Sequence, residues 1–113
     1  MNPDDLARFE TSAAAASRLL KAMAHDSRLL VLCQLAAGER QAGQIASRLS
    51  QSALSQHLAL LRSEGLVAAR RDGLAVHYRI ADPAVLAVIT TLAGIFCPPD
   101  QQEDAHVAAN LSR

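Results

Sequence analysis

Aromatic residues are scarce in this sequence of 113 residues, which has no tryptophan, one tyrosine and two phenylalanines. Alanine and leucine are abundant instead, and this balance favours a helical core over a sandwich of strands. The sequence also lacks an apolar run long enough to span a bilayer, and it has no basic-then-apolar leader. We therefore expect a cytoplasmic protein with no membrane partner.

The length allows one domain with a single hydrophobic core and excludes a second. We expect this domain to cover residues 1–99 and a flexible tail to cover residues 100–113, after Pro98 and Pro99.

The whole chain has no excess of positive or negative charge, but its middle third does. The formal net charge is zero, yet residues 40–81 carry six arginines against two carboxylates, a net +4, and the remainder balances them with −4. Because phosphate neutralisation depends on local charge, the basic middle third can still bind a nucleic acid.

Apolar residues recur at helical spacing in the first third of the chain. The pattern predicts a first helix that runs to about Ala24, with Asp4 as a possible cap. It predicts a second helix with Asp26 as N-cap and Gly38 just past its end.

A last helix should open at Asp82 and Pro83 and stop before Pro98. Its apolar residues cover too much of the circumference for a single contact inside one chain. We therefore expect a homodimer that forms through the first and last helices.

Between these helices the sequence predicts a short helix at 43–49, a tight turn and a second helix at 52–63, closed by Gly65. The period then changes from 3.6 to two, which predicts strands at 67–71 and 76–80 around an Asp72-Gly73 turn. The expected fold is mainly α with a β-hairpin wing, a winged helix-turn-helix.

In the helix at 52–63, leucines 54, 58 and 61 form an inward stripe, so polar residues near its N-terminus face outward. Such side chains can read base edges or hold phosphates, although an ordinary solvated face is the alternative. His57 lies beside the inward stripe, so a packed or capping role is as consistent with its position as a DNA contact. The DNA-binding candidates are Gln51, Ser52, Ser55, Gln56, His57, Arg62, Arg70, Arg71 and Arg79.

Cys33 and Cys97 are the two cysteines. In a reducing compartment two thiols indicate redox or metal chemistry more often than a structural disulfide. Both also have apolar neighbours in sequence, so small buried hydrophobes are the alternative that composition favours. A thiol oxidoreductase would need a Cys-x-x-Cys pair or a nucleophile with a base, and neither is present, so no enzyme is predicted.

Several motifs now occur in a specific order: LKAMAH at 20–25, SQSALSQHL at 50–58, LRSEGLV at 61–67 and YRIADP at 78–83. In these motifs the sequence resembles the ArsR/SmtB family of small repressors over roughly residues 12–97. The resemblance implies that the helix at 52–63 enters the major groove of an inverted-repeat operator of double-stranded DNA. Leu49 runs directly into Ser50, where relatives have about two more residues, so either the turn or the first helix of the pair is shortened.

The resemblance also bears on the ligand. Gln41 and Gly43 stand where metal-sensing members carry paired cysteines, and Ala84 stands two residues after Asp82, where another metal site has a histidine. Four ligands cannot be assembled from one carboxylate, so no metal and no cofactor is expected, with only His25 and His106 as outlying ligand candidates.

Cys33 and Cys97 occupy positions similar to those of the dithiol members that sense persulfides and oxidants. This likeness implies a repressor that leaves its operator when a reactive sulfur species or an oxidant links the two residues. The alternative is a regulator with inert thiols that a small molecule, a metal or a protein partner switches.

Overall fold

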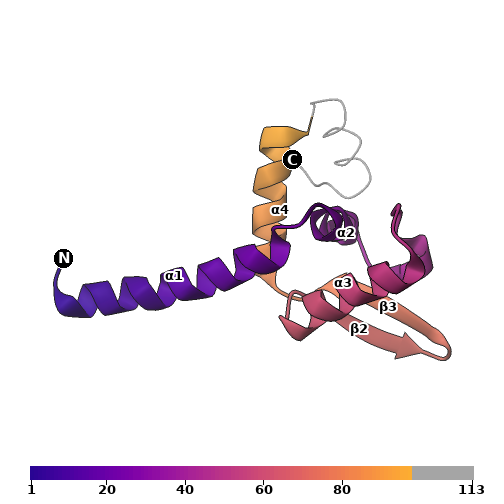
Figure 1. Ribbon diagram of the computed structural model, residues 1–113, viewed down its shortest axis with the longest axis horizontal. Coiled ribbons are helices and arrows are strands. Elements are labelled where there is room, and N and C mark those ends of the chain that lie inside the picture. The colour runs from indigo at the N-terminus through magenta and orange to yellow at the C-terminus, as the bar shows by residue number, and fades with distance from the viewer. Residues whose placement is uncertain (98–113) are drawn as a thin grey trace.

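The computed structural model describes residues 1–97, so the expected tail at 100–113 and the boundary at residue 99 lie outside the described residues. The described chain is mainly helical with a small antiparallel sheet, as predicted (Figure 1). Its elements are α1 (Pro3–Met23), α2 (Asp26–Ala36), β1 (Arg40–Gln41), the 3-10 turn η1 (Ala42–Gln44), α3 (Gln51–Ser63), β2 (Val67–Asp72), β3 (Ala75–Ile80) and α4 (Pro83–Phe96).

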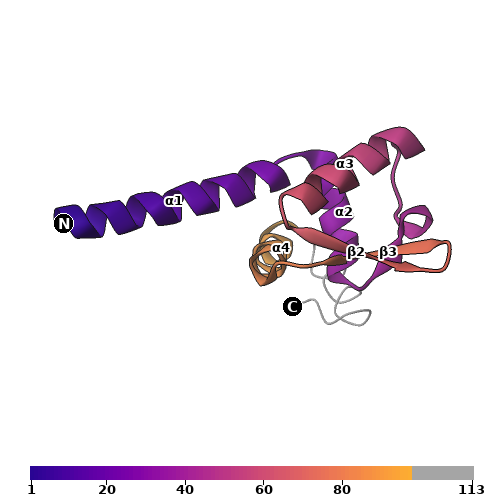
Figure 2. The ribbon, with the colours of Figure 1, turned by 90° about the horizontal axis from the view of Figure 1, so that it is seen from below.

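Helix α1 projects away from the rest of the chain, and the hairpin lies at the opposite end of the molecule (Figures 1 and 2). Only Ala22 and Met23 of this helix are buried. Large apolar side chains on its remaining length therefore stay uncovered in a single chain, among them Leu6, Phe9 and Leu20.

Two helix caps differ from prediction. Asn2 rather than Asp4 caps α1, and its side chain accepts a hydrogen bond from the Asp5 amide at 2.8 Å. At α2 the cap is His25, whose Nδ1 accepts from the Ser27 amide at 3.1 Å, while Asp26 is the first helical residue. There its carboxylate still faces the positive end of the helix dipole.

The prediction of a helix at 43–49 is wrong. One 3-10 turn, Ala42–Gln44, is followed by irregular chain up to Ser50. Ile45 is the only buried residue of this stretch, so a regular helix here would have no apolar stripe to bury. Of the two alternatives for the shortened motif, the structure has the shorter first helix.

The sheet has three strands in the order β1-β3-β2, where the sequence predicted two. Two residues are too few to show an alternating pattern, which is why β1 escaped prediction. Asp72 pairs with Ala75, so the turn residues are Gly73 and Leu74 rather than Asp72 and Gly73. Gly73 has a φ of 64°, a conformation that glycine adopts without steric cost.

Helix α2 lies at the centre of the fold, because it contacts α1, α3, α4 and β3. Helix α4 begins as predicted, with the Asp82 carboxylate accepting from the Ala84 amide at 2.9 Å and Pro83 as first helical residue. The largest fully buried side chains are Val31, Leu32, Leu58, Leu61, Leu66, Val85 and Ile89. One core thus joins the helix that carries Cys33 to the helix-turn-helix and to α4.

Candidate nucleic-acid interface and thiol pair

Helix α3 has the inward and outward faces that the sequence predicted. Leu54, Leu58 and Leu61 are buried in the core. The Ser50 hydroxyl caps the helix by accepting from the Ala53 amide at 3.1 Å. Four polar candidates of the first two turns are exposed, namely Gln51, Ser52, Ser55 and Gln56.

The N-terminal end of α3 combines two properties that suit DNA. Unpaired backbone amides and the helix dipole favour a phosphate there, and exposed amide and hydroxyl side chains can reach base edges. The first turn carries no acidic residue that would repel a phosphate.

His57 faces the junction of α1 and α2. Its ring lies 4.6 Å from the His25 ring, centroid to centroid, and its Nδ1 lies 3.5 Å from a guanidinium nitrogen of Arg28. Desolvation lowers the pKa of His57, and the nearby His25 and Arg28 lower it further. The neutral, packed ring favours the packing alternative over a base contact.

The wing arginines are in different environments. Arg70 donates to the Glu39 carboxylate from Nε and a terminal nitrogen, at 2.7–3.1 Å. This hydrogen bond lowers the pKa of Glu39, and the charges of Arg70, His77 and Arg79 lower it further. Arg71, on the opposite face of β2, is exposed near the hairpin tip, and Arg79 and Arg62 are also exposed.

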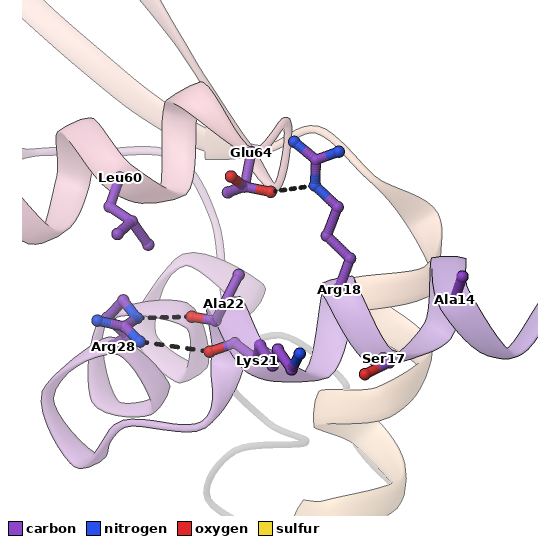
Figure 3. A pocket seen from close by; sticks show the side chains of 8 residues that line it. All are labelled: Ala14, Ser17, Arg18, Lys21, Ala22, Arg28, Leu60 and Glu64. Atoms are coloured by element: carbon purple, nitrogen blue, oxygen red, sulfur yellow. Dashed lines mark hydrogen bonds and ion pairs between the residues drawn. The ribbon is translucent and has the colours of Figure 1, made fainter.

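A second ion pair connects α1 to the end of α3. Arg18 Nε donates to Glu64 at 2.7 Å across a cleft of about 540 Å³, shown in Figure 3. Arg28, also in this cleft, donates to the Ala22 carbonyl at 2.6 Å and to the Lys21 carbonyl at 3.4 Å. The dimer-forming helix predicted from the sequence is therefore tied to the recognition helix by side chains.

The two cysteines lie on elements that touch. Cys33 is on α2 and Cys97 caps the end of α4, and these two helices contact each other. Within residues 1–97 neither cysteine is in a disulfide, and both residues are exposed in the chain. The alternative of two small buried hydrophobes does not describe these positions.

The environment of Cys33 disfavours the thiolate. Desolvation raises the pKa of Cys33, and the negative charge of the Cys97 thiolate raises it further. A thiol with a raised pKa reacts slowly until it is deprotonated.

In the described part of the chain, no three His, Cys, Asp or Glu side chains gather where they could hold a metal ion, and His106 lies outside it. No helix within residues 1–97 is long and apolar enough to cross a membrane.

Glu39 and Gln34 were not predicted as parts of the site. Glu39 pairs with Arg70 across 31 positions, and no local pattern marks so distant a partner. Gln34 bonds to Ala46 in the segment before α3, and its place inside the apolar run at 29–37 was the only signal in the sequence.

Comparison with known proteins supports this architecture. Residues 25–69 match the family described as "Bacterial regulatory protein, arsR family". The chain is 45% identical over 97 residues to the HTH-type transcriptional regulator YgaV of Escherichia coli, covering 83% of this chain and 98% of that protein. It is also 45% identical over 101 residues to the transcriptional activator HlyU of Vibrio cholerae, covering 88% and 94%, and 38% identical over 98 residues to the biofilm growth-associated repressor of Agrobacterium fabrum, covering 85% and 84%.

Solved structures agree. Reduced HlyU from Vibrio cholerae matches with a TM-score of 0.76 at 45% identity, covering 80% of this chain and 98% of that one. The homodimeric winged helix-turn-helix domain Mb0332 of Mycobacterium bovis matches with a TM-score of 0.67 at 32% identity, covering 88% of each. These likenesses confirm the predicted fold class and the prediction of a regulator rather than an enzyme.

Proposed function

Because this chain belongs to the arsR family of bacterial regulatory proteins, we propose that it is a repressor that binds an inverted-repeat DNA operator as a homodimer. The observation that carries the DNA-binding part is the exposed polar N-terminal face of α3. The hairpin beside it bears arginines at its exposed end. A homodimeric neighbour supports the assembly. The relative from Agrobacterium fabrum is named as a repressor and HlyU as an activator, and the proposal of repression follows the former.

In this proposal α3 enters the major groove, and the hairpin follows the phosphate backbone. Two copies related by a twofold axis then present two α3 helices to successive major grooves, so the operator is an inverted repeat. Arg71 and Arg79 contact the backbone directly. Arg70 does so only after it leaves Glu39, whose carboxylate holds it in the free protein.

Gln56→Ala and Arg71→Ala should separate base reading from phosphate binding. We expect Gln56→Ala to weaken operator binding about tenfold and binding to random DNA less than about twofold, because an amide reads base edges. Arg71→Ala should weaken both about equally and reduce the salt dependence. Fluorescence anisotropy on operator and scrambled duplexes at several salt concentrations measures this. Equal losses in both variants would remove Gln56 from the base-reading set.

We further propose that a covalent link between Cys33 and Cys97 releases the protein from its operator. With a peroxide, the two thiols lose two electrons and two protons, a disulfide forms and the peroxide becomes two waters. With a persulfide donor, one of the two cysteine thiolates takes the outer sulfur and the donor leaves as a thiolate. The thiolate of the other cysteine then attacks the inner sulfur of this persulfide, forms the disulfide and expels hydrosulfide.

The structural support for this link is that two exposed thiols lie on helices that contact each other. A structure of HlyU, which is 45% identical to this chain, is named as the reduced form of that protein, and this naming supports a test of redox state in this chain. Mass spectrometry of the protein after treatment with a persulfide donor tests the link directly. The expected result is a cross-link between the two cysteine peptides, with a mass two hydrogens below their sum.

The raised pKa of Cys33 predicts how its reaction depends on pH. At neutral pH, Cys33 should alkylate with iodoacetamide severalfold more slowly than glutathione, because a smaller fraction is thiolate. The gap should narrow as the pH rises toward the pKa of Cys33. Peptide mass spectrometry over a pH series gives both rates. A Cys33 rate equal to that of glutathione throughout would contradict this environment.

The alternative, a regulator with inert thiols, has an observation of its own. The cleft of about 540 Å³ between α1 and α3 could take a small molecule that changes the angle between these helices. The persulfide experiment separates the two, because inert thiols would leave both operator binding and the cysteine masses unchanged.

A further inference from the structure

Gln34 follows Cys33 on α2, and its side chain leaves the helix to meet the segment that precedes α3. Its Oε1 accepts from the Ala46 amide at 2.8 Å, and its Nε2 donates to the Ala46 carbonyl at 2.9 Å. Nε2 also lies 3.3 Å from the Leu30 carbonyl of the same helix. One side chain thus satisfies both backbone groups of Ala46 and fixes that residue against α2.

The main chain of Gln34 adds a second connection to the same segment. Its carbonyl accepts from Arg40 Nε at 3.2 Å, and another nitrogen of Arg40 donates to the Gln44 carbonyl at 3.4 Å. The irregular segment 42–50 is therefore held to α2 at Gln44 and at Ala46.

These bonds matter because the segment has no helix of its own to pack. Ile45 is its single buried side chain, so hydrogen bonds carry much of its positioning. The segment leads directly into Ser50, the N-cap of α3, and then into Gln51 and Ser52. A shift of Ala46 relative to α2 would therefore move the end of α3 that is proposed to meet DNA.

We propose that Gln34 is a positioning residue that fixes the N-terminal end of α3 and transmits the state of the cysteine pair to it. Successive residues of a helix point about 100° apart, so Cys33 and Gln34 serve different neighbours from one rigid element. Cys33 lies on a helix that contacts α4, the helix that Cys97 caps, while Gln34 holds Ala46. A link between the cysteines restrains α2, and the Gln34 amide carries that restraint to segment 42–50. The transmitting role rests on the proposed dithiol switch, and the positioning role does not.

The test uses the full chain with Gln34→Met. Methionine keeps the length and the helix propensity of the side chain but removes both the acceptor oxygen and the donor nitrogen of its amide. In the reduced protein we expect operator affinity to fall about tenfold and affinity for random DNA to change less than about twofold, because α3 is misplaced rather than lost. Gln44→Met is the matched control, because the Gln44 side chain accepts from the Gln41 amide of β1 rather than from α2, and the Gln44 carbonyl that Arg40 holds is kept. It should leave operator affinity within about twofold of the parent. Equal losses on both DNAs, or no loss, would overturn the positioning role.

A second measurement compares operator affinity before and after the cysteines are linked, with mass spectrometry to verify equal linking. On linking, the operator affinity of the parent and of Gln44→Met should fall about a hundredfold. The operator affinity of Gln34→Met should fall less than about tenfold relative to its own reduced form. A full hundredfold loss in Gln34→Met would overturn transmission through Gln34. If the linked parent keeps its affinity, the dithiol switch and the transmitting role both fail, while the reduced proteins still decide the positioning role.

Gln34→Glu, which keeps the acceptor for the Ala46 amide but loses the donor, replaces Gln34→Met if that variant does not fold, and the same losses are expected.

Discussion

Cys33→Ser and Cys97→Ser should each leave operator binding by the reduced protein unchanged and abolish its release by a persulfide donor or peroxide. Both residues are exposed, so serine removes the sulfur chemistry without opening a cavity in the core. The parent should lose about a hundredfold in affinity on treatment, which corresponds to about 2.7 kcal/mol of coupling between the link and DNA binding.

The double variant is the decisive control for this prediction. Anisotropy titrations with operator duplex, before and after treatment and again after dithiothreitol, give the affinities, and intact mass spectrometry gives the modification state. If the double variant still leaves DNA on treatment, the dithiol mechanism is wrong and another group senses the oxidant. If the parent is modified and stays bound, the link forms without acting as a switch.

The position of α2 explains why so local a bond should reach the DNA-binding face. The helix contacts α4, where Cys97 ends the chain's last described helix, and it also contacts α3. Close packing makes such a core resist gradual deformation, so a restraint at one face of α2 shifts its neighbours together.

Much of this arrangement could be predicted from periodicity. The stripe at Leu54, Leu58 and Leu61 fixed which face of α3 is buried, and the Asp82-Pro83 pair fixed the start of α4. The alternating residues at 67–71 and 76–80 indicated the hairpin. In each case the signal is local, because side chains that share a face recur at the period of the element.

The failures have the opposite character. The caps at Asn2 and His25 depend on which neighbouring side chain reaches the free amides first, and two candidates stood within two residues of each other. The helix expected at 43–49 was lost because long-range bonds from Gln34 supply what a packed helix would otherwise provide. The pairing of Arg70 with Glu39 likewise depends on β1, a strand of two residues that is too short to be predicted from an alternating pattern.

The uncovered side chains of α1 lead to the prediction with the largest effect. Phe9 is 61% exposed on α1, of which only Ala22 and Met23 are buried, while Ile95 and Phe96 of α4 are 66% and 76% exposed. Large apolar side chains exposed along two helices indicate a protein interface. A second copy is the partner that the inverted-repeat operator requires, because each chain carries a single α3.

Phe9→Glu should therefore convert the dimer to a monomer and lower operator affinity by about a thousandfold, because the two half-sites no longer bind as one unit. The fold of the single chain should survive, since the surroundings of Phe9 within the chain are already open to solvent. Thr11→Glu is the matched control: it puts the same charge on the opposite face of α1 and should leave the dimer intact. Sedimentation velocity at micromolar concentration reports the assembly, circular dichroism the helix content, and anisotropy the operator affinity. A Phe9→Glu protein that stays dimeric with unchanged affinity would exclude this face of α1 from the interface.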